Sequence, residues 1–238
     1  QVLLESDYSK EEQTKFLEII HSRSKHLLQI INDIVDISKI EAGQLKIEKQ
    51  ATEIHKVLDD FYQSYINTSK LKDNENVRLI LNKPENKTGL TIYSDPNRLN
   101  QVLSNLLNNA IKFTYEGFIE FGYFITQEDA LIFYVRDTGE GIPKEKQDVI
   151  FDRFGQGHDR FTQNFGGTGL GLSISKKIVE LLGGKMWLSS KVNEGSTFYF
   201  SLPNKKIGGE TDKTGTGTKA EVDTFEWNDK TILIAEDE

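Results

Sequence analysis

The chain has 238 residues, a formal net charge of −8 and no cysteine. A hydrophobic fraction of 37% can support a buried core, so wholesale disorder is excluded, and the acidic balance argues against a nucleic-acid binder. The lack of cysteine excludes disulfides, and no apolar run approaches the roughly 20 residues of a membrane helix. We therefore expect a cytoplasmic segment without membrane contact, whose parent could still be anchored in an inner membrane further upstream.

The first expected element is a long helix over residues 9–42. Ser9 and Glu12 have the spacing of a capping box, and Gly43 stands where a helix would end. Two apolar seams run along this helix, formed by Phe16, Ile20, Leu27, Ile30, Ile34 and Ile37 and by Leu17, Leu28, Ile31 and Val35. A helix of about 33 residues spans roughly 50 Å, which disfavours a buried helix of one monomer. We predict a bundle between molecules, most simply a homodimer.

Short helices and strands alternate through the middle of the chain. Strands are expected at residues 45–47, 77–81, 90–93, 118–125 and 131–136, and a closing hairpin at residues 185–190 and 196–202. Helices are expected at residues 52–71, 96–113 and 170–182, with a loop and one short helix over residues 143–168. This mixture predicts an α+β fold, a two-layer α/β sandwich with helices on one face of a sheet, preceded by the long bundle-forming helix.

The C-terminal part changes in composition. Residues 204–229 collect Gly, Thr, Lys and Glu without periodicity, which is typical of a flexible linker. Residues 230–238 contain a buried-strand pattern, Thr231-Ile-Leu-Ile-Ala235, followed by acidic residues. The expected organisation is therefore a helical segment over residues 1–43, a mixed α/β unit over residues 44–203, this linker, and the first strand of a further domain.

The helix predicted over residues 96–113 carries a polar stripe. Asn105, Asn109 and Lys112 follow at i, i+4 and i+7 and so share one face. Carboxamide oxygens and an ammonium group can hold Mg²⁺ or its water molecules and neutralise phosphate. A solvated polar face is the plainer alternative, and this helix alone does not separate the two.

Asp137 stands where a predicted strand ends, directly before Gly139 and Gly141. Glycines at this spacing let the backbone approach a flat ring, and a carboxylate can accept a hydrogen bond from an exocyclic amine. An ordinary strand-to-loop turn explains the segment equally simply, and taken alone the segment favours that turn.

A glycine-rich run, Gly166-Gly-Thr-Gly-Leu-Gly171, precedes the helix predicted over residues 170–182. Backbone N–H groups and the positive end of the helix dipole would face an incoming phosphate there. The spacing matches neither the dinucleotide fingerprint nor a Walker A loop, and a flexible hinge is the alternative. Phe151 and Phe154 could anchor a loop that closes over a bound nucleotide.

Taken in order, these segments resemble a known family. Asn105-x-x-x-Asn109-Ala-x-Lys112, Asp137-x-Gly-x-Gly141, Phe151-x-x-Phe154 and Gly167-x-Gly-x-Gly171 resemble the N, G1, F and G2 boxes of sensor histidine kinases, which share the Bergerat fold of the GHKL ATPases. The resemblance covers residues 44–203 and implies that ATP binds together with Mg²⁺. It implies that Asn109 holds Mg²⁺ and that Asn105 and Lys112 approach the phosphates.

The resemblance also implies an adenine site and a lid. Asp137 would accept from the adenine amine with Thr197 nearby, and residues 155–166 would form the lid. The remaining implied ATP-binding residues are Gly139, Gly141, Ile142, Phe154, Gly167, Thr168, Gly169, Leu170, Gly171 and Leu172. ATPases of the superfamily have a water-activating Glu where Asn105 stands, so the resemblance favours phosphoryl transfer to protein over hydrolysis.

The helix over residues 9–42 resembles the second helix of the family's dimerisation and histidine-phosphotransfer domain. The family's acceptor histidine lies on the first helix, before an acid and near a proline. His21 and His26 precede no acid, and no proline occurs before Pro84. His55 and His158 have no acceptor context either, so we expect the acceptor histidine to lie outside this chain.

At the other end, Ile232-Leu-Ile-Ala-Glu236-Asp237 resembles the first strand of a receiver domain, in which the acid pair Glu236 and Asp237 would help to hold Mg²⁺. The expected parent is a hybrid histidine kinase cut at both ends, an ATP-dependent protein kinase whose partners are a second copy and receiver or response-regulator domains. A GHKL-type ATPase and a non-catalytic nucleotide-binding scaffold stay open as alternatives.

Overall fold

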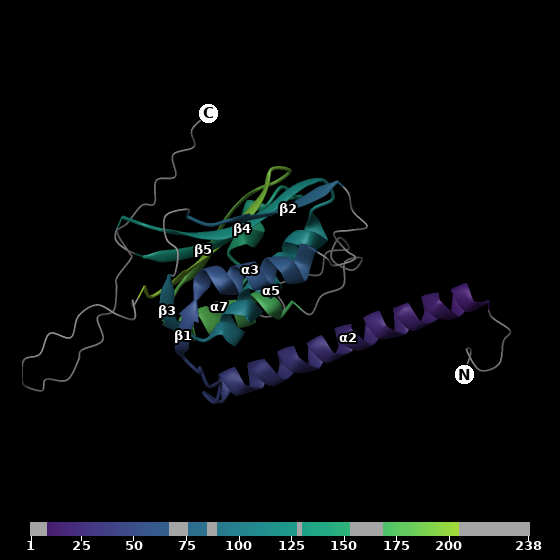
Figure 1. The fold of residues 1–238 in the computed structure, drawn as a ribbon, viewed down its shortest axis with the longest axis horizontal. Coiled ribbons are helices and arrows are strands. Elements are labelled where there is room, and N and C mark those ends of the chain that lie inside the picture. The colour runs from purple at the N-terminus through teal and green to yellow at the C-terminus, as the bar shows by residue number, and fades with distance from the viewer. Residues whose placement is uncertain (1–8, 67–75, 85–89, 128–129, 153–168, 205–238) are drawn as a thin grey trace, which may run out of the picture. The chain divides into compact units, whose positions relative to one another are not determined.

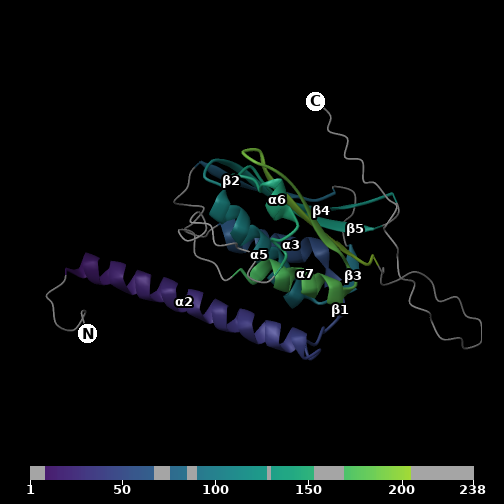
Figure 2. The same cartoon turned by 180° about the vertical axis from the view of Figure 1, so that it is seen from behind.

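The computed structural model describes residues 9–66, 76–84, 90–127, 130–152 and 169–204. Within these ranges the main sheet has five strands. Helices cover one face of this sheet, as Figure 1 and the opposite view in Figure 2 both show. The predicted two-layer α/β arrangement with a preceding long helix is confirmed. None of the described helices is long and apolar enough to cross a membrane.

Helix α2 runs from Lys10 to Glu41 and has the predicted ends. At its start, Glu12 N donates to Ser9 Oγ at 3.3 Å and Ser9 N donates to Glu12 Oε2 at 2.9 Å, which completes the capping box. At its end, Gly43 adopts a φ of 63°, the left-handed conformation that glycine tolerates and that stops a helix.

The apolar seam of α2 is uncovered over most of its length. Seven of its side chains are between 42% and 61% exposed: Leu17, Ile20, Leu27, Leu28, Ile31, Ile34 and Val35. Towards the end of α2, Ile37 and Ile40 pack against the core. The described residues of this chain leave the seven side chains named above largely exposed.

A hydrogen-bonded cluster joins α2 to helix α5 (Pro96–Phe113). Gln101 Nε2 donates to Asp36 Oδ2 at 2.7 Å, and Arg98 Nη1 lies 3.4 Å from the same oxygen. Arg98 Nη1 also donates to Gln101 Oε1 at 2.7 Å. All three side chains are half-buried, so they fix the end of α2 against the start of α5.

The segment after α2 differs from the prediction. The strand expected at residues 45–47 is absent, and strand β1 is Gln50–Glu53, paired antiparallel with β3 (Thr91–Ser94). Leu45 is buried although it belongs to no strand, so its apolar alternation with Ile47 reflects burial and not strand pairing.

Thr52 does not open a helix, because it lies within β1 and donates from Oγ1 to Ser94 O at 3.0 Å. Helix α3 begins two residues later and spans Ile54–Ile66. The predicted extension of this helix to residue 71 lies outside the described residues.

The main sheet has the strand order β2-β4-β5-β7-β6. Its strands are β2 (Val77–Asn82), β4 (Gly117–Ile125), β5 (Leu131–Asp137), β6 (Met186–Lys191) and β7 (Gly195–Leu202). These confirm the five strands predicted at residues 77–81, 118–125, 131–136, 185–190 and 196–202. β2 pairs parallel with β4, and the other pairs are antiparallel. β5 thus lies at the centre of the sheet, with β4 and β7 beside it.

Helices α3, α5 and α7 (Gly171–Leu182) cover one face of this sheet (Figure 1). α5 presents six buried side chains to the core: Leu99, Val102, Leu103, Leu106, Leu107 and Ala110. Its start is capped by Asp95, whose side chain accepts from Asn97 N and Arg98 N. A one-turn helix, α6 (Lys144–Gln147), follows β5. The helix with the predicted polar stripe is thus the best-buried helix of the sandwich.

Candidate nucleotide-binding site

Helix α5 connects the segments that the sequence assigns to the site. In its middle, Asn105 Nδ2 donates to Ser175 Oγ of α7 at 2.9 Å. At its end, the carbonyl oxygen of Phe113 accepts from Glu140 N, in the turn after β5, at 3.3 Å. The predicted phosphate and adenine elements are therefore joined through one buried helix.

Asn109 and Lys112 are half-buried on α5. Because both follow Asn105 at helical spacing, the intact helix keeps the three on one face, as the sequence predicts. Lys112 Nζ lies 4.7 Å from the centroid of the Phe113 ring, close to the turn after β5. The polar stripe therefore runs from the start of α7 towards that turn.

Asp137 ends β5 with only 6% of its surface exposed. Its Oδ1 accepts from Gly139 N at 2.9 Å and from Ser196 N at 3.3 Å. Burial raises the pKa of the Asp137 carboxyl, and these two hydrogen bonds oppose that rise. Both bonds go to Oδ1, so Oδ2 receives none from the part of the chain that the structure describes.

Ser196, and not Thr197, is the hairpin residue beside Asp137. In the pairing of β5 with β7, Asp137 faces Ser196 and Arg136 faces Thr197. Side chains alternate between the two faces of a sheet, so Thr197 lies on the face opposite to Asp137. The register therefore corrects the expected position of Thr197 by one residue.

Gly139 and Gly141 are needed for contacts within the protein. A Cβ atom at Gly139 would lie 2.3 Å from the Phe113 carbonyl oxygen. At Gly141, which has a φ of 69°, a Cβ atom would lie 2.0 Å from the Lys191 carbonyl oxygen. The two glycines thus let the turn fit between the end of α5 and the β6–β7 hairpin. The fold itself therefore needs glycine at both positions, whether or not a ligand binds.

Ser190 holds the next part of this turn. Its Oγ accepts from Ile142 N at 2.8 Å, and Gln147 Nε2 donates to both Ile142 O at 2.8 Å and Ser190 O at 2.9 Å. The turn after β5 is therefore fixed by hydrogen bonds on both sides. No sequence pattern indicates Ser190, Ser196 or Ser175, because only strand register and helix packing bring them to their partners.

The start of α7 is compact. Gly169 has a φ of 68°, Leu170 is buried, and Leu172 packs against the core. A Cβ atom on Gly171 would lie 2.2 Å from Asn105 Oδ1, so α5 and α7 approach closely here. Phe154, Gly167, Thr168 and the predicted lid at residues 155–166 lie outside the described residues.

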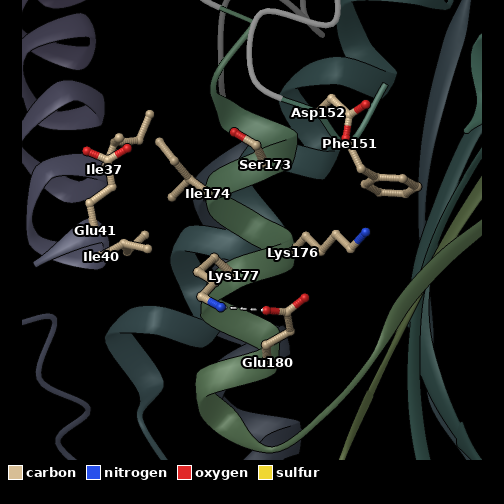
Figure 3. A pocket seen from close by; sticks show the side chains of 10 residues that line it. All are labelled: Ile37, Ile40, Glu41, Phe151, Asp152, Ser173, Ile174, Lys176, Lys177 and Glu180. Carbon is tan, nitrogen blue, oxygen red and sulfur yellow. Dashed lines mark hydrogen bonds and ion pairs between the residues drawn. The ribbon is translucent and has the colours of Figure 1, made fainter. Parts of the chain in front are cut away.

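A groove of about 390 Å³ opens beside this site, between α2 and α7. Figure 3 shows Ile37 of α2 and Ile174 of α7 pointing toward one another, with Phe151 on the far side of α7. Lys176 Nζ lies 5.4 Å from the centroid of the Phe151 ring. The first phenylalanine of the F segment therefore contacts α7, on the side away from α2.

The sheet, its helical layer and the turns around α5 form a two-layer α/β domain. Residues 94–206 match the family model described as histidine kinase-, DNA gyrase B- and HSP90-like ATPase. Residues 1–43 match the model of the His Kinase A (phospho-acceptor) domain. The first match makes this an ATP-binding domain.

Several curated proteins are similar over most of this chain. The circadian input-output histidine kinase CikA of Synechococcus elongatus is 36% identical, over 83% of this chain and 26% of that protein. The hybrid signal transduction histidine kinase A of Dictyostelium discoideum is 39% identical, over 85% of this chain and 10% of that protein. The autoinducer 2 sensor kinase/phosphatase LuxQ of Vibrio vulnificus is 35% identical, over 92% of this chain and 26% of that protein. The chain thus spans about a quarter or less of these relatives.

Solved structures agree with this assignment. Full-length ShkA in complex with AMPPNP has a TM-score of 0.67 at 23% identity, covering 83% of this chain and 40% of that one, and shows the same fold. The catalytic domain of histidine kinase ThkA has a TM-score of 0.55 at 30% identity, covering 66% of this chain and 96% of that one. The chain belongs to the sensor histidine kinases, and its α/β unit has the GHKL ATPase fold.

Proposed function

We propose that this chain is the catalytic region of a hybrid sensor histidine kinase, which transfers the γ-phosphoryl group of ATP to a histidine. One observation carries the proposal: α5 is bonded at Asn105 to the start of α7 and at Phe113 to the turn that follows Asp137. A phosphate-binding end and an adenine-binding end on one buried helix suit an extended nucleotide. The AMPPNP complex of ShkA is consistent with this use of the fold.

At the adenine end, Asp137 would accept from the exocyclic amine through Oδ2. Its other oxygen is already held by Gly139 N and Ser196 N, so the carboxylate is oriented before the ligand arrives. Preorganised acceptors of this kind give specificity because a ligand without the amine leaves them buried and unpaired. At the phosphate end, the backbone from Gly169 to Leu172 would supply N–H donors. Lys112, further along the same face of α5, would supply positive charge to the nucleotide.

The residues present also fit Mg²⁺. No group of three or more His, Cys, Asp or Glu side chains that could hold a metal occurs in the described ranges. Mg²⁺ in nucleotide sites takes one or two protein ligands and keeps phosphate oxygens and water as the rest, so a single carboxamide suffices. Asn109 would provide that ligand, and the ion would neutralise charge on the phosphates when bound.

The phosphoacceptor would be a histidine other than the four of this sequence. His21 and His26 on α2 precede no acid, and His55 is held inside the catalytic unit with Nε2 2.6 Å from Tyr123 Oη. We assign residues 1–43 to dimerisation, residues 44–203 to catalysis, residues 204–229 to a linker and residues 230–238 to a receiver strand with Glu236 and Asp237. The last two segments rest on sequence alone.

ATP binding and phosphoryl transfer can be tested together. We expect the chain to bind ATP in the presence of Mg²⁺, and Asp137→Asn to weaken binding at least about 10-fold because a hydrogen bond to a charged group is lost. Calorimetric titration measures this, with Asp148→Asn, an exposed carboxylate, as the matched control. With radiolabelled ATP, acid-labile label should appear on a separately produced dimerisation domain that carries the acceptor histidine.

Three results would contradict parts of the proposal. Absence of Mg²⁺-dependent ATP binding by the unmodified chain would leave a scaffold role. Rapid steady-state ATP hydrolysis without any acceptor protein would instead support a GHKL-type ATPase. Stable labelling of His21 or His26 in this chain alone would overturn the assignment of the acceptor.

A further inference from the structure

Ser175 is a buried hydroxyl on the inner face of α7. It is 1% exposed and lies one turn after Gly171, among the core side chains of the helix. A buried hydroxyl needs a hydrogen-bond partner, since burying it unpaired costs free energy. Ser175 finds one in Asn105, whose Nδ2 is 2.9 Å from its Oγ. The pair therefore joins the two helices that carry the N and G2 segments.

In this hydrogen bond the amide nitrogen of Asn105 is the atom that faces Ser175. The group is planar, so an amide nitrogen held by Ser175 directs the oxygen away from it. Oδ1 accordingly lies against Gly171, where an added Cβ atom would be only 2.2 Å away. Asn105 thus presents an oxygen, and not its NH₂ group, at the first residue of α7.

An oxygen at this position changes what Asn105 can contact. It accepts hydrogen bonds only, so it cannot bond to the oxygens of a phosphate group. It can accept from the water molecules that Mg²⁺ retains in nucleotide sites. The orientation therefore favours the hydrated ion over direct contact with phosphate.

We propose that Ser175 is a positioning residue for Mg²⁺-dependent nucleotide binding, which holds Asn105 so that Oδ1 faces the hydrated ion; this rests on the proposed function. Gly171 also helps to position Asn105, because only a residue without a side chain leaves room for Oδ1. The plainer role for Ser175 is helix packing alone. The two roles differ in whether the effect of Ser175 depends on Mg²⁺ and on Asn105.

The test compares ATP affinity with Mg²⁺ and with a chelator. We expect Ser175→Ala to weaken binding about 2- to 10-fold with Mg²⁺, the range for one net hydrogen bond, and to leave chelator affinity unchanged. Ser201→Ala removes another buried serine hydroxyl, which accepts from Lys185 N at 2.9 Å far along β7, and serves as the control. It should leave both affinities unchanged.

The second variant is Gly171→Ala. Its methyl group should displace Asn105 Oδ1 and produce the same Mg²⁺-dependent loss, without removing any hydrogen bond. In an Asn105→Ala background there is room for the methyl group and no amide to position. Both Ser175→Ala and Gly171→Ala should then have no further effect on the ratio of the two affinities.

Equal losses with and without Mg²⁺, or losses that persist in the Asn105→Ala background, would overturn the positioning role and leave Ser175 to packing. If Ser175→Ala does not fold, the Gly171→Ala comparison decides alone. Failure of the unmodified chain to bind ATP with Mg²⁺ is a different result, because it contradicts the proposed function itself.

Discussion

The two long helices, α2 and α5, have the same kind of apolar periodicity but opposite surroundings. On α5 the six core side chains are 2% exposed or less, because the sheet and α7 cover them. On α2 seven side chains of the two seams are between 42% and 61% exposed. A periodic apolar stripe therefore predicts a helix that needs a cover, and it does not tell whether the cover belongs to the same chain.

The exposed seam of α2 is costly enough to require a partner. Burying one Leu or Ile side chain stabilises by about 1.5–3 kcal/mol relative to leaving it in water. Contiguous exposed apolar surface of this kind marks an interaction site. The match of residues 1–43 to the His Kinase A domain fits assembly through this helix, with a second copy as the proposed partner.

The largest effect should follow from breaking that assembly. Substituting Leu28→Glu together with Ile31→Glu changes four side chains in a homodimer, so the dimer should lose about 6 kcal/mol or more and its Kd should rise about 10,000-fold or more. Sedimentation equilibrium measures this Kd. Thr14→Glu with Asn32→Glu adds the same charge beside the seam and serves as the control.

Unchanged association of the Leu28→Glu, Ile31→Glu variant would show that the seam is covered by something other than a second α2. If the control pair raised the dimer Kd equally, the effect would be due to charge repulsion and not to loss of apolar contacts in the seam. The catalytic unit should keep its circular dichroism spectrum in every case.

A smaller effect should distinguish leucine truncations on α5 from those on α2 by their free energies of unfolding. In the monomeric Leu28→Glu, Ile31→Glu background, Leu103→Ala should lower the free energy of unfolding by about 2–5 kcal/mol, because it leaves a cavity in the core. The same truncation at Leu17, which is 61% exposed, should change it by about 0.5 kcal/mol or less. Urea denaturation measures both, and similar losses would mean that α2 packs within the monomer.

Local sequence signals predicted most of the fold because they act within one element. Pro96 opens α5, Ser9 and Glu12 cap α2, and Gly183 ends α7 with a φ of 92°. The prediction for residues 45–53 was wrong because the structure of that segment depends on contacts between distant elements. Strand β1 is polar at most of its positions and exists through its pairing with β3, some 40 residues later, which no local pattern contains.

The site divides in the same way. The residues on one helix, Asn105, Asn109 and Lys112, keep the shared face that their spacing predicted. Contacts between elements could not be read from the sequence: Ser196 lies beside Asp137 through strand register, and Ser175 meets Asn105 through helix packing. Helical spacing is a local property, whereas these contacts depend on how separate elements are arranged.

Asp137 and α2 differ in what they bury. Asp137 is a buried ionisable group, whereas α2 exposes apolar side chains. Burial raises the pKa of its carboxyl despite the hydrogen bonds from Gly139 and Ser196. A raised folded-state pKa means that this group favours folding when it is protonated. Its contribution is complete below the unfolded pKa and is lost as the pH rises through the folded pKa.

The smallest effect should therefore be a pH-dependent gain from Asp137→Asn. The carboxamide of this variant does not ionise, so its stability relative to the unmodified chain should increase as the pH rises from about 3 to about 7. Urea denaturation across this pH range measures the difference, and Asp148→Asn gives the effect of the same change at an exposed position.

A variant that is more stable at neutral pH and binds ATP more weakly would show that the buried charge is kept for the ligand. Lower stability of Asp137→Asn at pH 7 would instead show that the Asp137 carboxylate stabilises the folded protein. The hydrogen bonds from Gly139 N and Ser196 N would then outweigh the burial of the charge. Asp137 would in that case hold the turn together before it holds any adenine.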